Sequence, residues 1–188
     1  MRRIDSVKRV RRPTPGIPND LALRLFAAFV FLCPTFAHAL DLPEGKVSLV
    51  LSGYSYHFNI RPGVKAESLN QRNYGLGLEF DHRKPAGATF RYVNNFGWYK
   101  DSLNSTAHYV GGAVFYDWLG DHRLRLSLGA ELSGFYSERY NQGRPFLALL
   151  PVANIGSESA SVNLVVVPRV PQFIDAGVVF VQFKIKIK

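Results

Sequence analysis

The sequence predicts an all-β protein, an eight-stranded antiparallel up-and-down transmembrane β-barrel that follows a cleaved signal peptide. Three observations predict it. Side chains alternate with a period of two through most of residues 40–188, one alternating face is apolar and aromatic while the other is small and polar, and residues 1–39 resemble a secretory leader. The chain therefore divides into a signal peptide at 1–39 and an outer-membrane barrel domain at 40–188.

The leader shows the three parts of a signal peptide. Met1–Arg12 is basic, Leu21–Phe36 is apolar except for one arginine and one proline, and Ala37-His38-Ala39 has the small-x-small pattern of a cleavage site. These features predict export across an inner membrane and removal of the leader.

Composition excludes several classes of protein. The 188 residues carry a formal net charge of +9, but residues 1–39 hold seven basic and two acidic side chains, so the remainder carries only +4. The single cysteine, Cys33, lies in the leader, which excludes a disulfide framework and a cysteine-based zinc site. The mature chain has no phosphate-binding glycine loop, metal-ligand cluster or nucleic-acid motif. We expect a monomer with no cofactor, no metal and no nucleic-acid partner.

Eight segments are predicted to be strands. In the first, Tyr54, Tyr56 and Phe58 face one way while Ser55 and His57 face the other. Four segments alternate cleanly, at Gly53–Asn59, Asn73–His82, Ala88–Asn95 and Arg123–Tyr136. Four alternate less cleanly, at His108–Trp118, Phe146–Ile155, Ala160–Val167 and Gly177–Lys188. Prolines at 145, 151, 168 and 171 are expected to interrupt strand pairing, because proline cannot donate to a β-ladder.

Alternation alone also fits a soluble sandwich or a lipocalin-like barrel. A soluble protein would present a long, charged and varied polar face to water. Here the polar face is largely Gly, Ser, Asn and Thr, and the opposite face has runs of Leu edged by Tyr and Phe. That pattern is typical of a narrow barrel with an outward apolar band and aromatic girdles. It predicts the outer membrane of a Gram-negative bacterium.

Three motifs resemble a known family. His57 lies near the end of the first strand, Asp101-Ser102 follows the third strand within Trp98–Asn104, and Arg144–Gly156 reads RPFLALLPVANIG. In this order and spacing the motifs resemble the PagP family, the outer-membrane lipid A palmitoyltransferases. The resemblance covers about residues 50–188 and implies the transfer of a palmitoyl chain from a phospholipid to lipid A.

The resemblance also implies roles for individual residues. His57 would be the catalytic base, with Asp101 and Ser102 completing the polar cluster, and Ser102 would serve either as nucleophile or as support for the oxyanion. Because neighbours in a strand face opposite sides, Asp101 and Ser102 can both face His57 only in a loop or bulge. Gly111 and Ala113 would line the acyl pocket, with Ala113 at its floor.

Two other functions compete with this interpretation. A non-enzymatic small outer-membrane barrel with a structural or ligand-binding role would have an interior filled by side chains and would be indifferent to loss of His57. A lipid A deacylase on a similar barrel would favour a His-x-Ser pair with an acid near the last strand, and the sequence has none.

Overall fold

The computed structural model describes residues 45–82, 89–120, 124–170 and 174–188. The predicted signal peptide lies outside the described residues. The predicted barrel domain is described from Gly45 onward.

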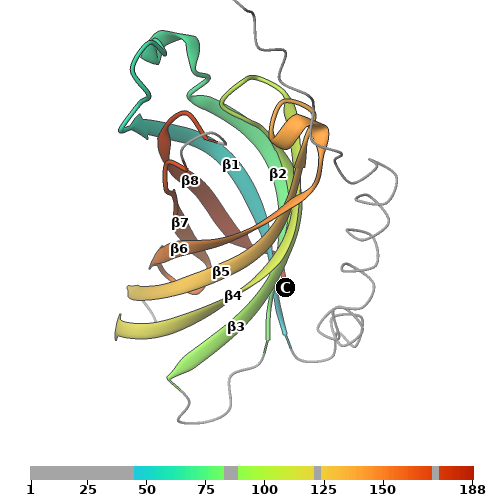
Figure 1. Ribbon diagram of the computed structural model, residues 1–188. Helices are drawn as coiled ribbons and strands as arrows, with labels where there is room; N and C mark the ends of the chain where they lie inside the picture. Colours follow the sequence, from blue (N-terminus) through green and yellow to red (C-terminus); the bar gives the residue numbers. More distant parts are fainter. Residues whose placement is uncertain (1–44, 83–88, 121–123, 171–173) are drawn as a thin grey trace, which may run out of the picture.

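Eight strands close into one barrel in which every strand pairs antiparallel with its neighbours in the sequence, and β8 pairs with β1 (Figure 1). The strands are β1 (Lys46–Phe58), β2 (Arg72–Asp81), β3 (Phe90–Lys100), β4 (Thr106–Gly120), β5 (Arg125–Ser137), β6 (Phe146–Gly156), β7 (Ala160–Val167) and β8 (Gly177–Lys186). Two 3-10 turns, η1 (Ala66–Ser68) and η2 (Asn141–Gly143), lie in loops. Among the described residues no helix is long and apolar enough to cross a membrane. The predicted eight-stranded up-and-down barrel is confirmed.

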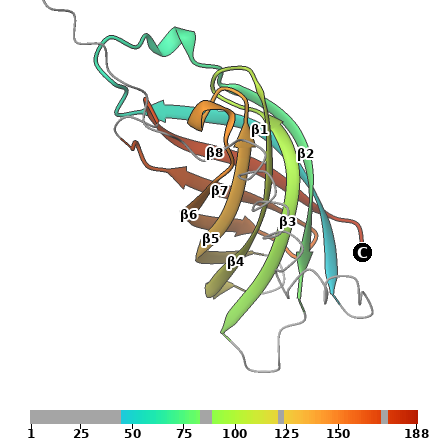
Figure 2. The same cartoon turned by 45° about the vertical axis from the view of Figure 1, so that its right-hand side comes forward.

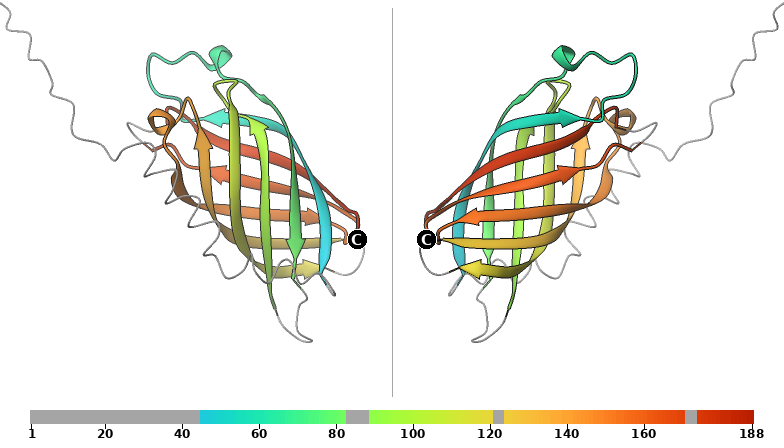
Figure 3. Two further views of the ribbon diagram at one scale, coloured as in Figure 1. Left: turned by 90° about the vertical axis from the view of Figure 1, so that its right-hand side faces the viewer. Right: turned by 90° about the vertical axis from the view of Figure 1, so that its left-hand side faces the viewer.

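The two ends of the barrel differ. The β1–β2, β3–β4, β5–β6 and β7–β8 loops lie at one end, called the loop end below, and the carboxyl terminus lies at the other (Figures 2 and 3). The strands are strongly tilted, as closure of a small barrel requires (Figure 3).

Polar side chains point inward and apolar side chains point outward. Ser55, Glu79 and Asn154 are at most 1% exposed, whereas Tyr56, Tyr92 and Leu132 are about half exposed or more, at 60%, 59% and 47%. Aromatic residues edge the outer face at both ends, for example Trp98 opposite His108 and Phe90 opposite Tyr116. The predicted orientation is confirmed. Closed barrels with this exterior span the outer membrane of Gram-negative bacteria, and the fold places this chain there.

The half of the interior away from the loop end is filled by hydrogen-bonded polar side chains. Lys184 pairs with Glu79, whose other carboxylate oxygen accepts from Asn163 Nδ2 at 3.3 Å. Closer to the terminal end, Arg91 Nη1 donates to Asp81 Oδ2 at 2.9 Å and its guanidinium lies 4.6 Å from the centre of the Phe115 ring. The paired charges make this half a plug rather than a channel.

One seam of the barrel is only half closed. β6 pairs with β7 from Val152 to Gly156 only, whereas β6 begins at Phe146 and pairs with β5 along its whole length. The ladder to β7 ends beside Pro151, and Pro168 directly follows β7. The sequence-based expectation of interrupted pairing therefore agrees with the structure at these two prolines, and Pro171 lies outside the described residues.

Glycine is required where Tyr109 lies against the wall. Gly77 pairs with Gly97, which in turn pairs with Tyr109, and a Cβ at position 77 would stand 2.4 Å from Tyr109 Oη and 2.7 Å from the Phe96 carbonyl oxygen. Gly77→Ala is therefore expected to lower the free energy of unfolding by about 1–3 kcal/mol, measured by urea titration in lipid vesicles. Tyr109→Phe in the same chain should recover part of the loss. Equal stability of Gly77→Ala and the wild type would contradict the packing described here.

Candidate functional site

A histidine and a serine from distant parts of the chain meet at the loop end. His57 Nε2 lies 2.7 Å from Ser102 Oγ, a hydrogen-bond distance, and both side chains are buried. His57 is the second-last residue of β1, and Ser102 lies in the β3–β4 loop. This is the arrangement in which a base can take a hydroxyl proton.

A β-bulge turns His57 into the barrel. The pairing of β1 shifts between Ser52 and Tyr54 against both β2 and β8, so Gly53 is an extra residue in the ladder to β8. Before the bulge Val50 and Ser52 face inward, and after it Ser55 and His57 do. Without the shift His57 would share the outward face of Leu51. The bulge re-aims the side chain next to the site.

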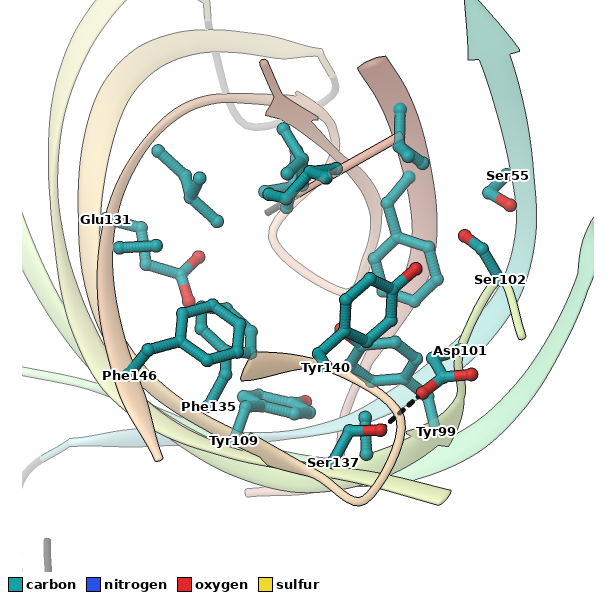
Figure 4. A pocket seen from close by; sticks show the side chains of 18 of the residues that line it. Ser55, Tyr99, Asp101, Ser102, Tyr109, Glu131, Phe135, Ser137, Tyr140 and Phe146 are labelled. Atoms are coloured by element: carbon teal, nitrogen blue, oxygen red, sulfur yellow. Dashed lines mark hydrogen bonds between the residues drawn. The ribbon is translucent and has the colours of Figure 1, made fainter. Parts of the chain in front are cut away.

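Asp101 holds the loop rather than the histidine. Its Oδ1 accepts hydrogen bonds from the backbone N–H groups of Leu103 and Ser105 at 2.9 and 2.8 Å, and its Oδ2 accepts from Ser137 Oγ at 2.6 Å (Figure 4). Asn104 adopts a left-handed conformation with φ of 60°. These bonds form a tight Asp turn, which leaves the side chain of Ser102 directed toward His57.

Tyr140 lines the same cavity as Ser102. It lies in the β5–β6 loop, and its ring points into the barrel mouth (Figure 4). Burial, aided by the Asp101 carboxylate, raises the pKa of Tyr140 to about 12, so its hydroxyl keeps its proton at neutral pH. The cavity wall beside the His-Ser pair therefore carries a phenol that can donate a hydrogen bond.

The second ring nitrogen of His57 has no protein partner among the described residues. Nδ1 is buried without a hydrogen bond. In a Ser-His-Asp triad a carboxylate occupies that position and orients the ring. The site here is a His-Ser pair with an adjoining tyrosine. No group of three His, Cys, Asp or Glu residues within the described chain is arranged to hold a metal ion.

Ser102 lines an interior cavity of about 500 Å³, and His57 lies behind it, outside the lining. Ser102, Asp101, Ser137 and Tyr140 line its mouth, and Figure 4 shows these side chains together on one side. Most of the remaining wall is aromatic and aliphatic, with contributions from Tyr99, Phe135, Phe146, Leu150, Val165 and Phe180. The cavity can hold a slender apolar chain next to the polar pair.

The cavity also reaches the half-closed seam. Its wall includes inward-facing Ala148 and outward-facing Leu149 of β6 together with Val167 and Pro168 at the end of β7. Both faces of β6 line the cavity only where β6 has no ladder to β7. The cavity therefore extends to the part of the β6–β7 seam that has no ladder.

Gly111 and Ala113 do not line the cavity. Both are on β4. Ala113 packs in a cluster with Val93 and Phe115, and a Cβ at Gly111 would stand 1.9 Å from Ser133 Oγ. The base of the cavity is formed instead by Glu131, Gln182 and Tyr109. The role of Gly111 and Ala113 in measuring an acyl chain stays a prediction.

The sequence predicted the pair but missed part of its surroundings. Tyr140 sits in a polar turn segment, Glu138–Pro145, that carries no pattern of its own. Glu131 was predicted to face inward, but periodicity does not show which inward residues border empty space. An up-and-down barrel brings alternate loops to the same end, so a search for aromatic residues in all loops at the end of His57 and Ser102 would have found Tyr140.

Comparisons with known proteins give similarity in fold only. No family model matches the chain, and no curated protein matches it. Among solved structures, Neisserial surface protein A is 10% identical to this chain, with a TM-score of 0.40. The match covers 76% of this chain and 96% of the Neisserial protein. The attachment invasion locus protein Ail of Yersinia pestis is 14% identical, with a TM-score of 0.41. That match covers 76% of this chain and 97% of Ail.

Proposed function

We propose that this barrel is an outer-membrane acyltransferase that moves a fatty acyl chain, of the palmitoyl class, from a phospholipid to lipid A. One observation carries the proposal: Ser102, at hydrogen-bond distance from His57, lines an apolar cavity within a transmembrane barrel. Acyl transfer needs an activated hydroxyl and a site for the chain, and the two adjoin here.

The proposed reaction proceeds in two balanced steps. First, His57 Nε2 takes the proton of Ser102 as Oγ attacks the phospholipid ester carbonyl, and the protonated imidazole returns that proton to the departing lysophospholipid oxygen. Second, a lipid A hydroxyl gives its proton to His57 and attacks the acyl-serine ester, and Ser102 leaves and regains a proton. Tyr140, protonated at neutral pH, donates a hydrogen bond to the oxygen that becomes negative. Asp101 acts as a positioning residue through its turn.

The loop end suits an anionic acceptor. Longer loops of outer-membrane barrels face the cell exterior, where lipid A resides. The four loop-end segments, including the strand-end residues Arg72 and Lys100, carry seven basic and four acidic side chains. One of these acids, Asp101, is buried, and another, Asp175, pairs with Arg61 at 3.1 Å. The surplus of positive charge favours the phosphate groups of lipid A.

The half-closed seam provides the donor with a route. A phospholipid in the outer leaflet would slide one chain between β6 and β7, past Leu149, into the cavity. Pro151 and Pro168 lie where this part of the seam is unpaired, as expected of residues that cannot donate to a β-ladder. No step requires the donor to leave the membrane.

Chain length would be set at the base of the cavity. Gly111 lies behind that base, because a Cβ there would collide with Ser133 Oγ, which donates to Glu131. Enlarging Gly111 or Ala113, the residue paired with Glu131, would push the base upward and shorten the chain accepted.

Ser102→Ala tests the covalent step. As a nucleophile, Ser102 is indispensable, and its loss should lower acyl transfer by on the order of 10³-fold or more. The measurement is transfer from a labelled phospholipid to lipid A by the purified barrel in vesicles. Ser105→Ala, which removes a hydroxyl from the same turn, is the matched control and should retain activity. A loss of tenfold or less in Ser102→Ala would contradict the acyl-serine step and favour direct transfer with Ser102 supporting the oxyanion.

A second candidate is a non-enzymatic small barrel with a structural or ligand-binding role. The unpartnered Nδ1 of His57 favours it, because nothing among the described residues orients the imidazole for proton transfer. That function predicts no transfer by the wild type in the same assay.

A further inference from the structure

The base of the apolar cavity carries a carboxyl group. Glu131 on β5 and Gln182 on β8 line the cavity at its deep end and are each 6% exposed. Glu131 lies six residues along β5 from Ser137, which is about 20 Å at the usual rise per residue. An otherwise apolar space therefore ends, far from the His-Ser pair, on two polar side chains.

One oxygen of this carboxyl group is bonded and the other is not. Oε1 of Glu131 accepts from Ser133 Oγ at 2.5 Å and from Asn95 Nδ2 at 3.2 Å. Within the described chain, Oε2 has no hydrogen-bond partner and no cation pairs with the group. Since Glu131 lines the cavity, Oε2 is the atom that faces it, and Figure 4 shows the carboxyl group directed into the space between the aromatic rings.

The neighbouring buried acid shows that this arrangement is particular to Glu131. Glu79 is also buried inside the barrel, but both of its oxygens are bonded, one to Lys184 and the other to Asn163. Glu79 belongs to the polar plug. Glu131 is the acid with an acceptor oxygen left for something inside the cavity.

The terminal methyl group of an ordinary acyl chain would fit this base poorly. Covering a buried carboxyl oxygen with a methyl group leaves the oxygen without a donor, which costs about tenfold in affinity. A hydroxyl group can donate to Oε2 of Glu131 and accept from the amide of Gln182. An ammonium group can donate but cannot accept.

We infer that the cavity selects an acyl chain whose far end carries a hydroxyl group, recognised by Glu131 and Gln182. The inference rests on the proposed function in one respect, that the cavity holds an acyl chain. It replaces the unsubstituted palmitoyl chain of that proposal by a chain of the same kind with a hydroxyl group at its far end, and it does not depend on the transfer step.

The test measures binding without turnover. The full barrel carrying Ser102→Ala, in lipid nanodiscs, is titrated with methyl esters of unsubstituted and ω-hydroxylated fatty acids of matched lengths, and the side-chain amide signals of Gln182 and Asn95 are followed by NMR. The ω-hydroxylated chain of the fitting length should bind about tenfold more tightly than its unsubstituted counterpart. Equal or weaker binding of the hydroxylated chain would overturn the inference, and so would tighter binding of an ω-ammonium chain.

Variants at the base of the cavity test whether Glu131 and Gln182 cause the preference for the ω-hydroxylated chain. Glu131→Leu should reverse this preference, and Gln182→Leu should reduce it. Glu131→Gln should keep the preference because an amide still pairs with a hydroxyl. Glu138→Leu, in the exposed β5–β6 loop, is the control and should leave it unchanged. If Glu131→Leu does not fold, Gln182→Leu decides, and an unchanged preference there counts against the inference. Loss of all chain binding in the parent barrel would instead contradict the acyl cavity of the proposed function.

Discussion

Replacing His57 with alanine is expected to lower the rate of acyl transfer by about 10²–10⁴-fold while the barrel stays folded. The imidazole lies 2.7 Å from Ser102, and among the described residues no other basic side chain forms a hydrogen bond with Ser102. Alanine leaves the serine hydroxyl without a proton acceptor. The rate is measured with labelled phospholipid and lipid A in vesicles, and folding by the shift in electrophoretic mobility on heating.

His108→Ala is the matched control for that experiment. His108 is exposed on the outer face of β4 and stacks on Tyr136, with ring centres 6.5 Å apart. It does not line the cavity, and the hydrogen bond of Ser102 goes to His57. Its replacement should change the rate by less than twofold or so. A His57→Ala barrel that transfers acyl chains at the wild-type rate would remove His57 from the mechanism.

Replacing Lys184 with methionine is expected to lower the free energy of unfolding by about 3–5 kcal/mol. Lys184 is the cation that pairs with Glu79 deep in the barrel, and both side chains are almost fully buried, at 7% and 2% exposure. Methionine would leave the Glu79 carboxylate buried without a counter-charge. Urea titration of the barrel in vesicles measures the effect.

Two further variants isolate the cause. Lys186→Met, at the exposed end of the same strand, removes an equal charge and should change stability by less than about 0.5 kcal/mol. Glu79→Leu combined with Lys184→Met should recover much of the loss, because no unpaired charge remains. A Lys184→Met barrel as stable as Lys186→Met would mean that water or another group compensates Glu79.

The strands were predictable because alternation reports directly on a two-faced sheet. All eight predicted segments overlap the observed strands, and Ala160–Val167 agrees at both ends. β1 begins earlier than predicted, at Lys46, because inward Val50 hides the alternation between Leu49 and Leu51. β3 ends later than predicted, at Lys100. The prediction stopped too early because inward-facing Tyr99 is aromatic and does not fit the small, polar pattern of the inward face. Inward apolar residues line the cavity and core, and they blur the pattern there.

The site was predictable only in part. The meeting of His57 with Ser102 came from resemblance, since periodicity does not show contacts between residues 45 positions apart. The turn role of Asp101 follows from local chemistry, because Asp commonly accepts from the backbone two residues on. Tyr140 and the exposed oxygen of Glu131 depend on how loops and large side chains pack, which a period-two pattern does not encode.

The most direct test of the account is mass spectrometry of lipid A from cells with and without the protein. Expression of the wild type should add one acyl group to lipid A, and expression of His57→Ala at the same level in the outer membrane should not. Lipid A of identical mass in all three cell populations, with the wild-type barrel folded in the membrane, would contradict the acyltransferase and leave the non-enzymatic barrel in its place.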